Sequence, residues 1–121
     1  MPWFGLDDKP LAQLSVFSDA ERHAIAKDAA SAITNQFDLV ERALATSDLE
    51  TVAEAAHRAR NETLLIGARP LTNLLADLER AARGGEQESA SAAARQARAI
   101  WPATQAAIDK VAAGADQPRS P

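Results

Sequence analysis

The stretch AAHRARNETLLIGA, residues 55–68, has the periodicity of an amphipathic helix, and the rest of the chain is organised around it. At about 100° per residue, one side of this helix collects mostly small and aliphatic residues that form its buried stripe: Leu49, Val52, Ala56, Ala59, Thr63 and Ile66. His57 falls nearly opposite that stripe. Its neighbours on that side of the helix are Ala53, Arg60, Asn61 and Leu64. We therefore expect the imidazole to point into solvent, beside a guanidinium and a small apolar patch.

The composition favours a single helical domain that does not bind nucleic acid. The 121 residues are enough for one domain with one core. Hydrophobic residues make up 46% and charged residues 25%, which is ordinary for a soluble globular protein. Only 4% of the residues are aromatic and alanine is abundant, so packed helices are favoured over sheets. A net charge of −4 argues against a nucleic-acid-binding protein, which would need a basic surface.

Metal sites and membrane segments have little support in the sequence. The chain has no cysteine, which excludes disulfides, iron–sulfur clusters and thiolate zinc sites. His23, the other histidine, has no second ligand-type residue at metal-binding spacing, so we expect no metal site. The first ten residues lack the cationic and apolar segments of a secretory signal, and no apolar run approaches the roughly 20 residues that span a bilayer. We therefore expect a cytoplasmic protein that does not contact a membrane.

Helix start signals divide the first half of the chain. Ser18 is followed three residues later by Glu21, which is the pattern of a capping box at the start of a helix. Hydrophobic residues then keep helical spacing until about Thr46. Ser47 and Glu50 repeat the capping-box pattern, so we expect a second helix to begin there.

Glycine and proline mark the boundaries of the second half. Gly67 should end the second helix, because a glycine adopts the left-handed cap conformation without steric cost. Pro70 fits the first position of a third helix, and the glycines at 84–85 should end it. A fourth helix is expected over about residues 87–111. Pro102 lies inside it and lacks an N–H group, so we expect a kink or a break in the turn before it.

These elements predict an all-α fold. Four amphipathic helices joined by short turns pack as an antiparallel, up-down-up-down four-helix bundle, which we assign to residues 18–113. Residues 1–17 are expected to form an arm with a short helix that caps the bundle. The polar, proline-containing residues 114–121 are expected to be a disordered tail.

The central stretch resembles a known signalling family. AHRARN, residues 56–61, is followed by Gly-Ala at 67–68 and by LTNLLADLE, residues 71–79. This pattern resembles the histidine-containing phosphotransfer domain of multistep phosphorelays. Members of that family carry an Ala-His-x-Leu-Lys-Gly segment, then Gly-Ala about six residues later, and then a Leu-rich helix that ends in Leu-Glu. The resemblance covers roughly residues 25–111.

The resemblance implies roles for individual residues. His57 would be the phosphoacceptor, and Arg60 stands where the family has its lysine. Arg60 and Arg58 would stabilise the phosphoryl group through charge-assisted hydrogen bonds. Asn61 replaces a glycine that clears space beside the imidazole, and Glu62 brings a carboxylate where a small residue is usual. The Asn61 side chain could narrow access to the ring, or it could donate a hydrogen bond to the phosphoryl group.

The resemblance also implies a function and a partner. The protein would be a phosphocarrier and not an enzyme, taking a phosphoryl group from the aspartate of one receiver domain and passing it to another. Its partners would be response-regulator receiver domains, including one in a hybrid histidine kinase, and Mg²⁺ would belong to the receiver, with no cofactor on this chain. Ala53, Leu64 and Leu65 would form the apolar surface on which a receiver docks.

Three alternatives stay open at this point. The same fold could serve as an adaptor that is not phosphorylated, in which Asn61 and Glu62 mark a lapsed site. The bundle could instead be a dimerising helical scaffold with the N-terminal arm, residues 1–17, as its interface. Leu64 could also pack under that arm instead of forming a docking surface.

Overall fold

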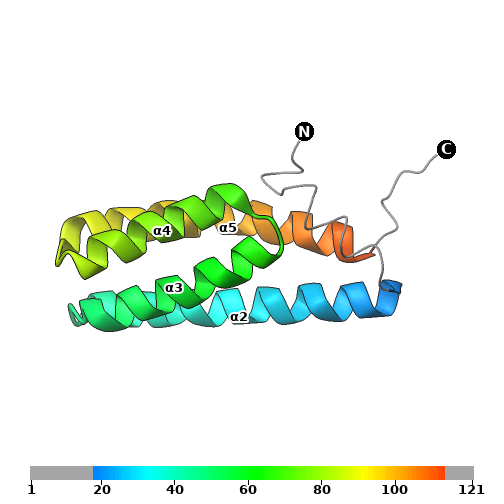
Figure 1. Ribbon diagram of the computed structural model, residues 1–121, viewed down its shortest axis with the longest axis horizontal. Helices are drawn as coiled ribbons and strands as arrows, with labels where there is room; N and C mark the ends of the chain where they lie inside the picture. The colour runs from blue at the N-terminus through cyan, green and yellow to red at the C-terminus, as the bar shows by residue number, and fades with distance from the viewer. Residues whose placement is uncertain (1–17, 114–121) are drawn as a thin grey trace.

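The computed structural model describes residues 18–113, and within that range it contains four helices and no strands (Figure 1). Each helix packs against the next one in the chain, and the last helix returns to pack against the first. Successive helices run in opposite directions, joined by short turns (Figure 1). This confirms the predicted all-α, up-down-up-down four-helix bundle. The helices are α2 (Asp19–Ala45), α3 (Leu49–Leu65), α4 (Arg69–Arg83) and α5 (Gln87–Ala113).

Two predicted segments cannot be compared with the structure. The N-terminal arm and helical cap (residues 1–17) and the disordered tail (residues 114–121) lie outside the described residues.

None of the four helices within residues 18–113 combines the length and the apolar character that crossing a bilayer requires.

The core formed by residues 18–113 contains mainly aliphatic residues, with one aromatic pair. The rings of Phe37 and Trp101 lie 6.0 Å apart between centroids at an angle of 41°, joining α2 to α5. Alanines line the buried face of α5 and allow its neighbours to approach closely. Each fully buried large side chain contributes about 1.5–3 kcal/mol relative to an exposed one. The largest of these are Phe37, Ile33, Leu71, Leu75, Leu78, Val40 and Val52.

The buried face of α3 is wider than the predicted stripe. Val52, Ala56 and Ala59 are buried as expected, but Ala53 and Ala55 are buried as well. The reason is that α3 packs against both α2 and α4, so its buried surface extends over two contact faces. The prediction that Ala53 belongs to an exposed docking surface is therefore wrong.

Of the two capping boxes predicted from the sequence, the one at the start of α2 is present and the one at the start of α3 is not. At α2 the Glu21 N–H donates to Ser18 Oγ (3.1 Å), and the Ser18 N–H donates to Glu21 Oε1 (2.8 Å), which confirms that capping box. The second capping box is wrong, because Asp48 caps α3. The Thr51 N–H donates to Asp48 Oδ1 (3.2 Å) and its hydroxyl to Oδ2 (2.6 Å). Ser47 has φ +56° and lies in the turn before the cap.

The glycine and proline signals largely hold. Gly67 has φ +78° and follows Ile66, the C-cap of α3, so the helix ends there as predicted. Pro70 is the second residue of α4 instead of the first. The prediction at Pro102 was a kink or a break, and the break is wrong, because α5 is one helix from Gln87 to Ala113. The exposed proline removes one backbone hydrogen bond, while Trp101 and Thr104 on either side of it are buried and hold the helix against the core.

Candidate functional site

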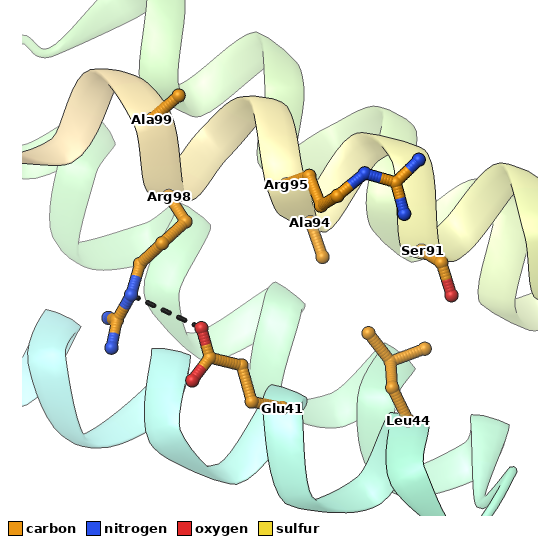
Figure 2. Close-up of a pocket in the computed structure, with 7 residues that line it drawn as sticks. All are labelled: Glu41, Leu44, Ser91, Ala94, Arg95, Arg98 and Ala99. Atoms are coloured by element: carbon orange, nitrogen blue, oxygen red, sulfur yellow. Dashed lines mark ion pairs between the residues drawn. The ribbon is translucent and has the colours of Figure 1, made fainter.

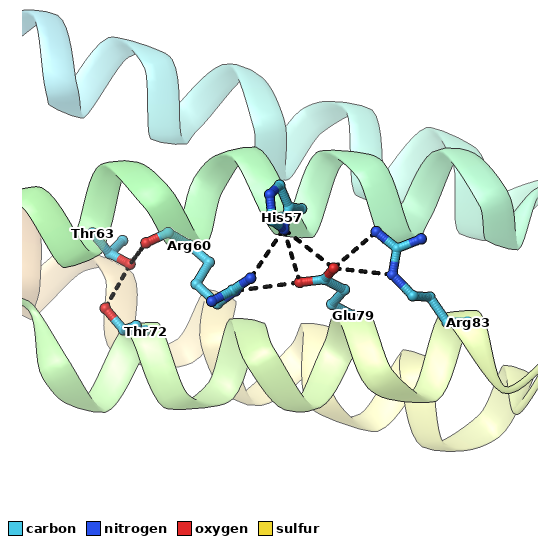
Figure 3. A network of polar contacts seen from close by, with 6 residues as sticks. All are labelled: His57, Arg60, Thr63, Thr72, Glu79 and Arg83. Atoms are coloured by element: carbon cyan, nitrogen blue, oxygen red, sulfur yellow. Dashed lines mark hydrogen bonds and ion pairs between the residues drawn. The ribbon is translucent and has the colours of Figure 1, made fainter.

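His57 lies in the middle of α3 and faces α4 across the seam between the two helices (Figure 3). Its side chain is 45% exposed, so the imidazole does reach solvent. It is not free, however, because Nδ1 faces the carboxylate of Glu79 on α4, at 3.3 Å from Oε1 and 3.2 Å from Oε2. Within residues 18–113, all the polar contacts of the ring involve Nδ1. The ring is therefore held at one nitrogen, and this leaves Nε2 for chemistry.

Glu79 is the centre of the polar network in this seam (Figure 3). Its side chain is only 14% exposed. Arg60 donates from Nε to Oε1 (3.2 Å), and Arg83 donates to Oε2 from Nε (3.0 Å) and Nη2 (2.8 Å). Burial by itself would raise the pKa of Glu79, but the hydrogen bonds from Arg83 and His57 and the charge of Arg60 hold it below its usual value. The carboxylate is therefore ionised at neutral pH.

Arg60 contacts the histidine as well as the acid. It lies three residues after His57, so the two side chains are neighbours on the helix surface. Its Nη2 lies 3.0 Å from His57 Nδ1 while its Nε is bound to Glu79. The planar guanidinium makes this possible, because it presents several N–H groups in a fixed fork.

A pair of threonines fixes the spacing of the two helices near Arg60. Thr63 on α3 is fully buried, and its hydroxyl lies 2.7 Å from the hydroxyl of Thr72 on α4 (Figure 3). The Thr63 hydroxyl also lies within hydrogen-bond distance of the Arg60 carbonyl (3.0 Å), and the Thr72 hydroxyl of the Ala68 carbonyl (2.9 Å). These contacts tie the backbone that carries Arg60 to the helix that carries Glu79.

The other predicted site residues do not join this network. Arg58 and Asn61 are exposed, and within residues 18–113 neither makes a hydrogen bond to His57 or Glu79. Glu62 is partly buried on α3. The structure thus brings Arg60 to the histidine and leaves Arg58 and Asn61 in solvent beside it.

Leu64 and Leu65 are exposed, as the sequence analysis expects. Their exposed fractions are 59% and 65%, and they are the exposed large hydrophobic residues of the described part of the chain. Leu64 lies two helical turns after His57, so the two side chains share a face of α3. The site therefore has a solvent-facing apolar edge at the C-terminal end of α3.

Sequence reasoning missed Glu79 and Arg83. Glu79 stands in the Leu-Glu pair at the end of the Leu-rich motif, and Arg83 follows it by one helical turn. The spacing of these two residues therefore predicts an ion pair on α4, which the structure contains. The proximity of Glu79 to His57 could not be predicted from spacing, because it depends on the register between α3 and α4. The position next to the buried Leu78 is the signal that places Glu79 near a helix seam.

A hollow lies in the seam between α2 and α5 (Figure 2). Given the order in which the helices pack, this seam is opposite the one that carries His57. Arg98 donates from Nη2 to Asp38 Oδ1 (3.5 Å), and its Nε forms an ion pair with Glu41 Oε2 (3.2 Å). Its guanidinium also lies 5.3 Å from the centre of the Phe37 ring. The hollow is lined by Glu41, Leu44, Ser91, Ala94, Arg95, Arg98 and Ala99.

The hollow between α2 and α5 has no activated nucleophile. Ser91 lines it, but within residues 18–113 no histidine or carboxylate is hydrogen-bonded to the Ser91 hydroxyl. A metal site is not formed there or elsewhere in residues 18–113, where no three His, Cys, Asp or Glu side chains come together as ligands. The seam between α3 and α4 is therefore the better candidate for chemistry.

Comparison of the chain with protein-family models, with curated proteins and with solved structures found no match. The chemistry of the site consequently has to be judged from the arrangement of His57, Arg60, Glu79 and Arg83.

Proposed function

We propose that this chain is a phosphocarrier of the histidine-containing phosphotransfer type, which accepts a phosphoryl group on His57 and passes it on. The observation that supports this most directly is the way the ring is held. Nδ1 faces the largely covered carboxylate of Glu79, while the His57 side chain as a whole is 45% exposed. An imidazole fixed at one nitrogen and open at the other suits a nucleophile better than a structural histidine.

The reaction needs little from this chain besides a positioned nucleophile. The lone pair of His57 Nε2 attacks the phosphorus of an aspartyl phosphate in line with the leaving carboxylate oxygen. The P–N bond forms as the P–O bond breaks, and the electron pair leaves with the aspartate of the donor. Mg²⁺ and most of the charge neutralisation belong to the receiver domain, since phosphoryl transfer depends mainly on positioning and electrostatics. The reverse step passes the group to the next receiver.

Glu79 is a positioning residue in this scheme. Nε2 has a free lone pair only when the ring proton is on Nδ1, and the Glu79 carboxylate is placed to accept that proton's hydrogen bond. The same negative charge offsets the positive charge that the ring gains as the P–N bond forms. This is the role that the acid plays beside a histidine in a hydrolase triad.

The charged surface around His57 suits a phosphoryl group. Arg60 is already at the ring, and Arg83 lies on the other side of Glu79. Arg58 and Asn61 are exposed beside them and free to turn toward an incoming phosphate. Together these side chains supply the donors that a phosphoryl dianion requires.

The partner in this proposal is a response-regulator receiver domain, including one in a hybrid histidine kinase, in the cytoplasm. The exposed pair Leu64 and Leu65 offers apolar surface next to the nucleophile, where desolvated contacts contribute most to binding. The N-terminal arm that a dimerising scaffold would use lies outside the described residues.

One observation favours the alternative of an adaptor that is not phosphorylated. Arg60 Nη2 can only donate a hydrogen bond, and it lies 3.0 Å from Nδ1. When Nδ1 accepts that bond, the ring proton is on Nε2 and the nucleophilic lone pair is absent.

Phosphorylation of the whole chain separates the two functions. A receiver domain that carries a labelled aspartyl phosphate is mixed with the protein, and acid-labile, base-stable label is measured. We expect label on the wild type and on His23→Gln, whose histidine is exposed on α2 outside the site, and none on His57→Gln. Label that persists in His57→Gln would disprove the site. If neither a receiver nor phosphoramidate, a small phosphoryl donor, labels His57 faster than His23, the adaptor is the better reading.

A further inference from the structure

His57 Nδ1 has two partners that make opposite demands on it. Arg60 Nη2 lies 3.0 Å away, and the Glu79 carboxylate oxygens lie 3.2 and 3.3 Å away. A guanidinium only donates hydrogen bonds and an ionised carboxylate only accepts them. Nδ1 can satisfy one of them at a time, because it carries either a proton or a lone pair.

The two choices correspond to the two neutral tautomers of the ring. When Arg60 donates to Nδ1, the ring proton is on Nε2, and the exposed nitrogen has no lone pair. When Nδ1–H donates to Glu79, Nε2 carries the lone pair and is a nucleophile. The reactivity of the exposed nitrogen is therefore decided at the nitrogen that faces α4.

Arg60 is also the partner that is able to leave. Glu79 is anchored independently, because Arg83 donates two hydrogen bonds to Oε2 and neither depends on Arg60. The guanidinium of Arg60 is attached to the carboxylate through Nε alone. A phosphoryl group that arrives at the ring offers stronger acceptors than a neutral imidazole nitrogen does.

We propose that Arg60 sets the tautomer of His57, holding the ring in the unreactive Nε2–H form until an incoming phosphoryl group draws the guanidinium away from Nδ1. The ring then loses its Nε2 proton to water and takes one up at Nδ1, where Glu79 accepts the hydrogen bond, so the net charge of the ring does not change. The release of Arg60 by a phosphoryl group rests on the proposed phosphocarrier function. The control of the tautomer by Arg60 in the free protein does not depend on that function.

The tautomer can be measured in the free protein, without any phosphoryl donor. Long-range ¹⁵N–¹H correlation spectra of the full chain at pH about 8.5, well above the ordinary histidine pKa of about 6.5, report which ring nitrogen carries the proton. We expect mainly Nε2–H in the wild type. Arg60→Met should shift the ratio toward Nδ1–H by about tenfold, the factor that corresponds to ~1.4 kcal/mol.

Two further variants control this measurement. Arg58→Met removes a neighbouring exposed guanidinium that does not contact the ring, and the ratio should stay as in the wild type. Glu79→Ala removes the acceptor and should shift the ratio further toward Nε2–H. A wild type that is already mainly Nδ1–H, or an Arg60→Met ratio that matches that of Arg58→Met, would overturn the proposal.

Phosphorylation by phosphoramidate tests the release of Arg60 separately. Arg60→Met should be phosphorylated on His57 faster than the wild type, because its ring already has the reactive tautomer. A slower rate together with the expected shift in tautomer would keep the control by Arg60 and reject the release step. Wild-type protein that is not phosphorylated at all would overturn the phosphocarrier function, and the tautomer ratios would still stand.

Discussion

The two opposite seams of this bundle hold inverse charge arrangements. Between α3 and α4, one acid, Glu79, is contacted by His57, Arg60 and Arg83 (Figure 3). Between α2 and α5, one arginine, Arg98, is contacted by two acids. The acid in the first seam is 14% exposed, whereas Asp38 and Glu41 in the second are 49% and 50% exposed.

This difference shows that burial, more than the number of charges, distinguishes the α3–α4 seam from the α2–α5 seam. A carboxylate that is largely out of water persists as an anion only with several donors around it, and those donors fix its position. An ion pair in solvent is free to rearrange and contributes little. The His57 ring placed against this largely covered acid is therefore held in position, while the Ser91 hydroxyl in the α2–α5 hollow has no such partner within residues 18–113.

The largest expected effect is on recognition of the partner. Substitutions beside the α3–α4 seam should weaken it, and a substitution in the α2–α5 seam should not. Changing the exposed apolar pair, as Leu64→Asp with Leu65→Asp, should slow phosphoryl transfer from a receiver domain by about tenfold or more, since it removes apolar contacts worth ~1.4 kcal/mol or more. Arg95→Glu in the α2–α5 hollow is the matched control and should leave the rate unchanged. Equal effects of the two changes would place the docking surface elsewhere. The initial rate of label transfer gives the comparison.

The next effect is on stability. Glu79→Gln should lower the free energy of unfolding by about 1–3 kcal/mol, because two arginines lose their charged partner at a largely buried position. Glu41→Gln in the exposed pair should cost less than ~1 kcal/mol. Urea unfolding followed by circular dichroism measures both. If the two substitutions lower the free energy of unfolding by the same amount, the difference in burial between the two seams does not affect stability.

The sequence predicted the fold well because the fold depends on local signals. Helical periodicity, the Ser18–Glu21 capping box and Gly67 are each readable within a few residues, and all three were correct. Two local predictions were wrong, the capping box at Ser47 and the break at Pro102, because in each case a competing interaction nearby was stronger. Asp48 caps α3 in place of Ser47 through two hydrogen bonds to Thr51, and burial of Trp101 keeps α5 continuous at Pro102.

The site was predicted only in part, because it depends on contacts between helices. The outward direction of His57 and the proximity of Arg60 follow from positions on one helix. The contact between His57 and Glu79 spans two helices and requires their register, which periodicity does not give. Ala53 shows the same limit, since its burial results from α4 as well as α2.

A third prediction concerns pH. The pKa of Glu79 is lowered in the folded protein, so its contribution to stability is present above the unfolded value of 4.5 and is lost as the pH falls through the lower folded value. The stability difference between the wild type and Glu79→Gln should therefore shrink as the pH falls below 4.5. The Asp48 pKa is lowered too, by hydrogen bonds from the Thr51 side chain and backbone, but this contribution is common to both proteins and cancels. A difference that grew in acid would mean that Glu79 is protonated more easily in the folded state.

The smallest expected effect is on the response to salt, and it sharpens the comparison between the seams. Raising the ionic strength from about 0.1 M to 1 M shortens the Debye length from ~10 Å to ~3 Å, which screens exposed pairs far more than buried ones. The cost of Glu41→Gln should fall toward zero over this range, because Arg98 and Glu41 face each other in solvent. The cost of Glu79→Gln should mostly persist, since its hydrogen bonds are direct and the carboxylate is largely covered. Urea unfolding at both salt concentrations measures the two changes, and a parallel decline would show that the α3–α4 network is as open to solvent as the pair on the opposite side of the bundle.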